Sequence, residues 1–243
     1  MRYVLLNDRY APITSGIGFI ECASSVAANA FSSWQEVIQE SRGVAVRRLE
    51  LHGGLSENLQ HLLPLTSVEC RRFLFQPTRS NWTAYFDNGH RGTDVFSVVS
   101  TLCEKIGCRG IRALCIEDTM RKSPTGYRGR YGGAIIEFYA ADRSKCNFLN
   151  IQRSISAAND GGRWRFNASG EPFPFETQAS YQIPRVRDRF TPQMLDEYLQ
   201  ALGIHMFSEE FFNSDCPGYL IKKEGPHADK MKEFTLADVQ ASF

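Results

Sequence analysis

The sequence CNFLNIQRSISAANDGGRWRFNA, residues 146–168, indicates the architecture of this protein most clearly. Polar and apolar residues alternate with a period of two in Phe148–Ser156, and Trp164 and Phe166 alternate with arginines. This pattern predicts two strands, Cys146–Ala158 and Arg163–Ala168. The linker Asn159-Asp160-Gly161-Gly162 predicts a hairpin with Asp160-Gly161 at its turn, because both residues tolerate positive φ. The first strand has one polar phase, so one of its faces is expected to meet solvent. Together these residues predict an antiparallel sheet.

The residues around this hairpin add three expectations. Arg153 falls in the apolar phase of the first strand, so it needs a charged or polar partner. Asn167–Gly170 resembles a further turn. Phe173 and Phe175 alternate with prolines, which favours an edge strand or a loop packed by its two rings.

The rest of the chain combines helix and strand patterns. Helical spacing of apolar residues, with capping residues at the ends, predicts helices at Ser25–Ser41, Ser56–Leu63, Thr93–Ile106 and Thr191–Leu202, and a short one from Thr235. Further strands are expected at Val44–Leu51, Arg72–Gln76, Trp82–Asp87, Cys108–Glu117 and Gly133–Ala140. This order predicts an α+β fold, a mixed and mainly antiparallel sheet with amphipathic helices packed on it. A single domain over residues 1–243 is favoured; the alternative divides the chain near residues 120–130.

Composition limits the function classes. The net charge is +1, so any electrostatic recognition has to be local. The N-terminus carries charge where a signal peptide needs an apolar run, and no stretch approaches the about 20 apolar residues of a membrane span. We therefore expect a cytoplasmic protein that does not act in a membrane.

The seven cysteines predict no metal site. Cys103, Cys108 and Cys115 have the spacing C-x4-C-x6-C, which fits no zinc signature, and no histidine lies at ligand spacing. In a reducing compartment such cysteines are mostly small buried hydrophobes. No cofactor and no metal ion are expected.

The segment Arg121–Gly133 has a composition that folding alone does not explain. It holds four positive charges, no negative charge, two tyrosines and several glycines, but no phosphate-binding P-loop pattern. Arginine forks bind carboxylate or phosphate, and tyrosines anchor interfaces. The alternative is a solvated loop whose charges keep the protein in solution. The residues expected to contact a partner are Arg121, Lys122, Tyr127, Arg128, Arg130 and Tyr131.

A second candidate lies where a predicted strand meets a helix start. Asp87, His90 and Arg91 cluster there, and a histidine beside a carboxylate can act as a general base. The alternative is purely structural, because Asn88-Gly89 is a common turn pair and Thr93 a common helix cap.

A short pattern adds a family resemblance. Gly162-Arg163-Trp164-Arg165-Phe166, then Gly170-Glu171-Pro172 and Phe175-Glu176, resembles a pattern in bacterial single-domain α+β proteins. Some of those are immunity proteins that neutralise a toxin. The resemblance implies a cytosolic protein that binds a partner protein, and it transfers no catalytic residue. The near-neutral charge departs from the acidic surface common in inhibitors of nucleases, which leaves the class of toxin open.

Three function hypotheses follow. The first is a non-catalytic binding protein with a protein partner, of the immunity type. The second is an enzyme of unassigned class with a pocket near Asp87 and His90. The third is nucleic-acid binding through residues 121–133.

Overall fold

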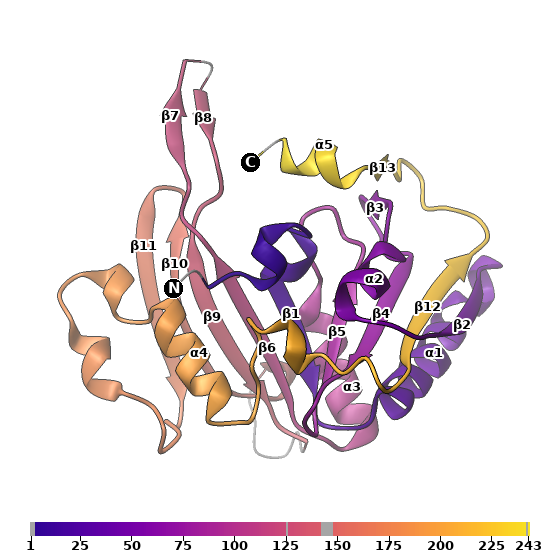
Figure 1. Ribbon diagram of the computed structural model, residues 1–243, viewed down its shortest axis with the longest axis horizontal. Coiled ribbons are helices and arrows are strands. Elements are labelled where there is room, and N and C mark those ends of the chain that lie inside the picture. The colour runs from indigo at the N-terminus through magenta and orange to yellow at the C-terminus, as the bar shows by residue number, and fades with distance from the viewer. Residues whose placement is uncertain (1–2, 125, 142–147, 242) are drawn as a thin grey trace.

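The computed structural model describes residues 3–124, 126–141, 148–241 and 243. The strands of its main sheet are β1 Gly16–Ile20, β2 Ala45–Leu51, β4 Arg72–Pro77, β5 Thr83–Asp87, β6 Gly110–Ile116, β9 Gly133–Tyr139, β10 Ile151–Asp160, β11 Arg163–Gly170 and β12 Gly218–Glu224. Within the described residues they form one nine-stranded sheet in the order β11-β10-β9-β6-β1-β5-β4-β12-β2 (Figure 1). Every neighbouring pair is antiparallel. The predicted α+β class is confirmed.

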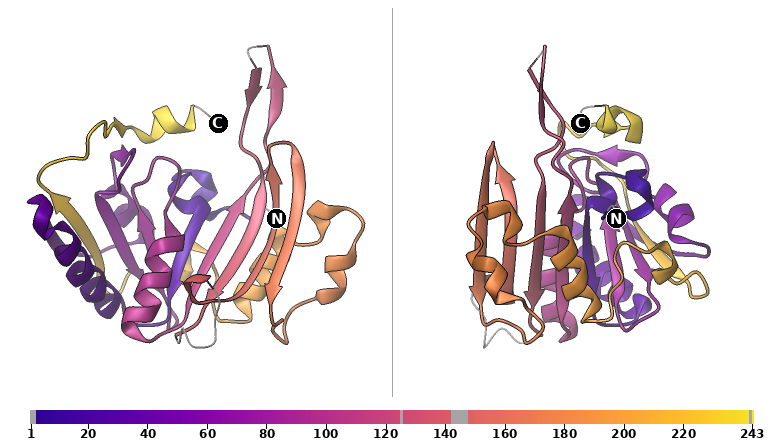
Figure 2. Two further views of the ribbon diagram at one scale, coloured as in Figure 1. Left: turned by 180° about the vertical axis from the view of Figure 1, so that it is seen from behind. Right: turned by 60° about the vertical axis from the view of Figure 1, so that its left-hand side comes forward.

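Helices and loops cover both faces of this sheet (Figures 1 and 2). α1 (Ser24–Gln39) and α3 (Val95–Ile106) pack on one face. α2 (Leu55–Gln60) and α4 (Pro192–Gln200) pack on the other. α5 (Leu236–Gln240) lies near one end of the strands. No described helix combines the length and apolar character needed to cross a bilayer.

The central strands contain consecutive buried apolar residues because both of their faces are covered. In β4 the consecutive residues Phe73, Leu74 and Phe75 are all buried. Phe73 and Phe75 pack against Phe31 of α1, with ring centroids 4.7 and 5.3 Å apart. Leu74 belongs to the core on the opposite face. Such strands lack the alternation that marks a strand with one wet face.

The predicted hairpin forms, with a shifted turn. β10 pairs with β11 from Arg153 opposite Gly170 to Asp160 opposite Arg163. The two-residue loop is Gly161-Gly162, with φ of +65° and +103°, rather than Asp160-Gly161. Two consecutive positive φ values suit glycine best, so the turn takes the glycine pair.

One boundary near this hairpin was predicted wrongly, and another cannot be compared in full. β11 continues through Gly170, so Asn167–Gly170 is strand and not a turn. β10 begins at Ile151, and the predicted start at Cys146 lies outside the described residues. Phe173 and Phe175 lie in a loop and stack on each other, their centroids 5.3 Å apart.

Two of three predicted helix caps are confirmed. Thr191 accepts a hydrogen bond from the Met194 backbone at the start of α4. Thr235 and Asp238 form a capping box at the start of α5. Thr93 does not cap α3, because its hydroxyl donates to the carbonyl of Ile13, and Asp94 precedes the first helical residue.

Candidate functional site

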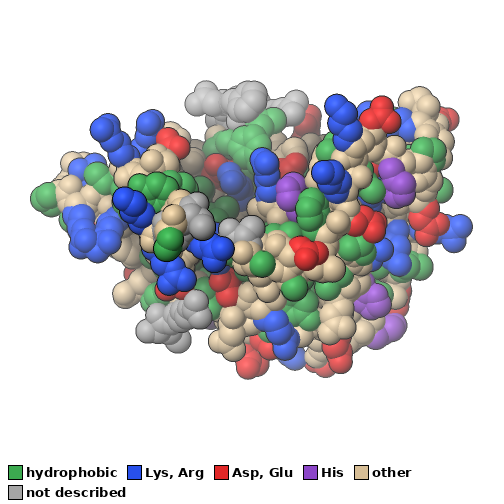
Figure 3. Space-filling view, turned by 90° about the horizontal axis from the view of Figure 1, so that it is seen from above, with side chains coloured by type: hydrophobic (Ala, Val, Ile, Leu, Met, Phe, Trp, Pro, Cys, Tyr) green, Lys and Arg blue, Asp and Glu red, His purple; other side chains and the backbone are tan. Residues whose placement is uncertain are grey.

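The basic segment forms a hairpin that projects from the sheet. β7 (Arg121–Ser123) pairs with β8 (Gly126–Arg128), and together they extend beyond the other elements (Figures 1 and 2). Thr125, at the turn, lies outside the described residues. Tyr127 is 72% exposed. Lys and Arg side chains gather around this hairpin in the view from above (Figure 3).

Like charges face each other across the hairpin. Arg121 lies directly opposite Arg128, and Lys122 lies opposite Tyr127. Directly opposed residues of an antiparallel pair share one face, and like charges there are unfavourable. Among the described residues, Arg121, Lys122 and Arg128 form no ion pair. The hairpin therefore presents two adjacent guanidinium groups that the described part of the chain leaves unneutralised.

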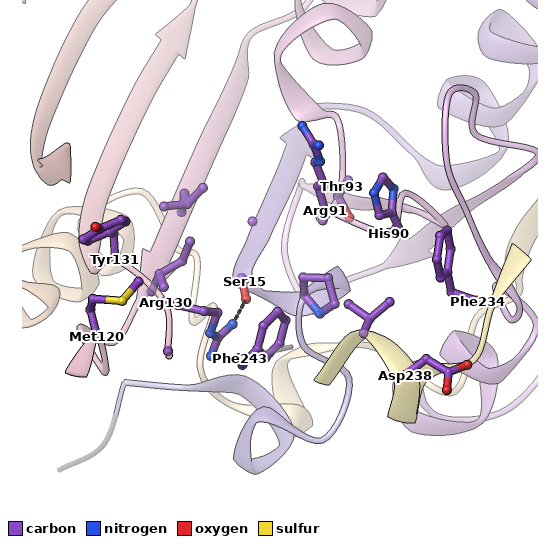
Figure 4. Close-up of a pocket in the computed structure, with 17 residues that line it drawn as sticks. Ser15, His90, Arg91, Thr93, Met120, Arg130, Tyr131, Phe234, Asp238 and Phe243 are labelled. Carbon is purple, nitrogen blue, oxygen red and sulfur yellow. Dashed lines mark hydrogen bonds between the residues drawn. The ribbon is translucent and has the colours of Figure 1, made fainter. Parts of the chain in front are cut away.

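Arg130 behaves differently from the other predicted contact residues. Its guanidinium turns toward the body of the protein, forms an ion pair with Asp8 and donates to Ser15 Oγ at 3.0 Å. The Phe243 ring centroid lies 4.5 Å from the guanidinium carbon (Figure 4). Arg130 therefore anchors the hairpin base. Tyr131 follows it there and is 39% exposed.

Glycines allow the two legs of the hairpin to approach closely. A Cβ on Gly129 would lie 2.3 Å from the carbonyl oxygen of Thr119, and one on Gly132 would lie 2.6 Å from the backbone nitrogen of Asp118. Gly129 also has a φ of +110°. The glycine spacing thus has a structural origin in the legs of the hairpin.

Gly129→Ala should loosen the hairpin without unfolding the sheet. The clash and the positive φ together should cost about 2 kcal/mol locally. Hydrogen exchange of residues 119–130 should accelerate by about thirtyfold, while exchange in β1 and β6 stays at the wild-type rate. Gly43→Ala is a matched control, because Gly43 also has positive φ but its Cβ would meet nothing within 4 Å. Unchanged exchange in the hairpin would contradict the close-approach explanation.

A cavity of about 770 Å³ opens at the base of the hairpin. Met120, Arg130 and Tyr131 line it on the hairpin side, as Figure 4 shows. The loop between β5 and α3 and the C-terminal segment line the opposite side. Residues on that side include His90, Arg91, Phe234, Asp238 and Phe243.

The structure thus brings four of the predicted site residues to one cavity. They are Arg130 and Tyr131 from the basic segment, and His90 and Arg91 from the turn after β5. Arg121, Lys122, Tyr127 and Arg128 do not line it. The C-terminal contributors, Phe234 and Phe243, were not among the predicted site residues. The capping box at Thr235 showed that a helix starts there, but nothing in the local sequence indicates what it faces.

The side chain of Asp87 holds the turn before α3 in place through hydrogen bonds. It is fully buried and accepts four hydrogen bonds, from Cys70 Sγ, the Tyr85 hydroxyl and the backbone amides of Gly89 and Asp94. Burial raises the pKa of Asp87, and these donors oppose that rise. The carboxylate of Asp87 therefore accepts the hydrogen bonds that fix the turn leading into α3.

His90 makes contacts other than with Asp87. Its ring Nδ1 lies 3.2 Å from the Thr66 carbonyl oxygen, to which it can donate, and its ring stacks on Phe234 with centroids 5.2 Å apart. Asp87, His90 and Arg91 border a smaller cavity of about 370 Å³. Cys70 also borders that cavity, and burial raises the pKa of its thiol, which makes it a poor nucleophile. General-base chemistry of His90 with Asp87 would require a hydrogen bond between the ring and the carboxylate. Among the described residues, no such bond joins them.

The structure groups the cysteines differently from the sequence spacing, which had placed Cys103, Cys108 and Cys115 together. The thiols of Cys103 and of the more distant Cys22 interact with the Cys108 thiol and lower its pKa. Cys115 lies elsewhere, with its Sγ 3.5 Å from the carbonyl oxygen of Tyr3. Within the described ranges, no group of three His, Cys, Asp or Glu residues is placed to hold a metal ion. Cys146 lies outside those ranges.

No protein-family model, no curated protein and no solved structure matches this chain.

Proposed function

We propose that this protein is a non-catalytic binding protein that contacts an acidic surface of a partner protein through the β7–β8 hairpin. An immunity-type inhibitor works in this way when the partner is a toxin. The observation that carries the proposal is the opposed pair Arg121 and Arg128 at a projecting, exposed hairpin. Carboxylates of a partner that lie between the two guanidinium groups would relieve their repulsion and form bidentate pairs.

The tyrosine on the other face of the hairpin supports a protein partner. Tyr127 is exposed, and tyrosine and arginine are the residue types enriched in interface hot spots. Nucleic-acid binding requires several phosphate contacts over an extended basic surface. Arg130 is already neutralised by Asp8, and the net charge of the chain is only +1. A protein partner therefore fits the charge distribution better.

Arg121→Ala combined with Arg128→Ala tests the proposal. We expect this double variant to lose partner capture from a lysate of the native host while its melting temperature stays unchanged or rises slightly. The slight rise is expected because the like-charge pair costs about 0.5 kcal/mol. The measurement is quantitative mass spectrometry of cross-linked partners, with a thermal melt in parallel.

The matched control is Arg163→Ala combined with Arg165→Ala. It removes the same charge from the tip of another exposed hairpin, next to the turn between β10 and β11, where only Arg165 of the two has an ion-pair partner among the described residues, the exposed Asp160. Partners captured equally by the wild type and both double variants would refute the proposed role of the hairpin. Capture of nucleic acid, lost in the first double variant and falling steeply with salt, would instead support the third hypothesis.

A further inference from the structure

The cavity at the base of the hairpin has the size and composition of a small-molecule site. Its volume of about 770 Å³ falls within the range of about 300–1,000 Å³ that is typical of ligand pockets. Leu114, Ile116, Met120 and Val239 give it an apolar lining. Ligand pockets commonly combine such a lining with a few polar groups that fix the ligand's orientation.

Cationic groups supply the polar contacts. Arg91 lines the cavity, is exposed, and forms no ion pair with any described residue. Arg130 lines it as well, and Asp8, Ser15 and Phe243 hold its guanidinium in place. A cation held by several neighbours is preorganised, which lowers the entropic cost of binding.

The acidic groups nearby are already engaged. Asp238 is the one acidic side chain among the described residues that line the cavity. Its carboxylate accepts hydrogen bonds from the backbone and the hydroxyl of Thr235, and these bonds hold its pKa below the usual range. Asp8 pairs with Arg130. Arg91 is therefore left to attract an anion.

The C-terminal wall of the cavity is fixed to the body of the protein. Gln240 Nε2 donates to the carbonyl oxygens of Arg9 and Ala11, at 3.0 and 3.1 Å. β13 (Glu233–Phe234) pairs with β3 (Leu65–Thr66) beside it. The cavity is thus enclosed by anchored elements, and a ligand would enter a preformed site.

We propose that this cavity binds a small organic anion, in which a carboxylate, sulfonate or phosphate group is attached to an apolar or aromatic body. The anionic group lies at Arg91, and the body lies against the apolar lining. This site is separate from the exposed face of the hairpin, so its test does not depend on whether the hairpin binds a partner protein.

Two probes that share one apolar body test the charge requirement. They are 8-anilinonaphthalene-1-sulfonate and its uncharged parent, N-phenyl-1-naphthylamine. Fluorescence titration and calorimetry should show one site per chain, with the sulfonate bound about tenfold more tightly than the neutral probe. In Arg91→Ala the two affinities should become equal, and in Arg91→Glu the order should reverse. Arg91 is exposed and unpaired, so these variants should fold normally.

Gly16→Leu tests the location. Gly16 lines the cavity in extended backbone, and a Cβ there would have its nearest neighbour at 3.7 Å, which is ordinary van der Waals contact. We expect the rest of a leucine side chain at this position to occupy part of the cavity. We expect this variant to weaken both probes at least tenfold with an unchanged melting temperature; Gly16→Ala, expected to weaken them less, replaces it if the melt shows unfolding. Arg121→Ala with Arg128→Ala should leave both affinities unchanged. Equal binding of the two probes to the wild type, several weak sites, no binding, or affinities indifferent to Arg91 and Gly16 would each overturn the proposal.

Discussion

Arg153→Ala should lower the free energy of unfolding by about 4 kcal/mol, because it leaves the buried carboxylate of Glu176 without its cation. The side chains of Arg153 and Glu176 are 3% and 0% exposed. Their ion pair is bidentate, with Nε to Oε1 at 2.9 Å and Nη2 to Oε2 at 2.6 Å. Arg153 also donates to the carbonyl oxygens of Ser169 and Gly170. Its removal thus leaves the buried charge of Glu176 without a cation and takes a hydrogen-bond donor away from two carbonyl groups.

Glu176 remains useful as a hydrogen-bond acceptor after the arginine is lost. It accepts from the backbone of Phe173 at 2.9 Å and from the Tyr181 hydroxyl at 2.9 Å. Adding Glu176→Gln to Arg153→Ala should therefore restore about half of the lost stability, because the amide oxygen still accepts and no charge stays buried. Urea denaturation of the wild type and the two variants measures both effects. If the free energy of unfolding of Arg153→Ala lay within about 1 kcal/mol of the wild-type value, the ion pair with Glu176 would not have the stabilising role assigned to it.

The same pair shows how far the sequence predicts the fold. The alternation in Phe148–Ser156 put Arg153, which is buried in β10, in the apolar phase of the predicted strand and required a partner for it. It could not identify that partner, because Glu176 lies in a loop beyond β11 whose path depends on the packing of Phe173 and Phe175 against Phe138. Local pattern thus predicts which face a residue occupies, whereas its contacts depend on tertiary packing.

Two strands of the sheet were not predicted, for different physical reasons. β1 is buried on both faces and contains two glycines, so it shows neither alternation nor strong strand propensity. Gly18 must be glycine, since a Cβ there would lie 2.6 Å from Val99 of α3. β12 pairs with β4 and β2, which lie more than a hundred residues earlier in the chain. Without these two strands the predicted ones cannot join into a single sheet.

The candidate site also has a part that the sequence indicated and a part that only the fold reveals. Composition distinguished the segment Arg121–Gly133 as a basic loop, because its charges and tyrosines serve no purpose in the core, but it did not predict that the segment forms a hairpin. The cavity beneath it is assembled from the hairpin base, the turn after β5 and the C-terminal segment. Arg130 illustrates the difference: the sequence groups it with Arg128, but Asp8 and Ser15 draw it inward. Only the fold shows which arginine is available to a partner.

Asp87→Ala should destabilise the protein by about 3–5 kcal/mol, because it removes a fully buried acceptor that serves four donors. The Tyr85 hydroxyl and the amides of Gly89 and Asp94 would lose their partners, each at a cost of about 1 kcal/mol or more. The amides belong to the turn that carries His90 and Arg91, so this turn should lose protection against hydrogen exchange. Chemical denaturation gives the global effect, and exchange of residues 88–94 gives the local one.

Asp94→Ala is the matched control for Asp87→Ala. It removes an equal charge seven residues away, but the Asp94 side chain is exposed and, among the described residues, accepts a hydrogen bond only from Ser97. Its backbone amide stays available to Asp87. We expect a loss below about 1 kcal/mol and normal exchange in the turn. Because the turn lines the large cavity, Asp87→Ala should also weaken the naphthalene sulfonate probe, and Asp94→Ala should not. If the two alanine variants behaved alike, charge removal and not the lost hydrogen bonds would explain the effect, and Asp87 would not be what holds the turn in place.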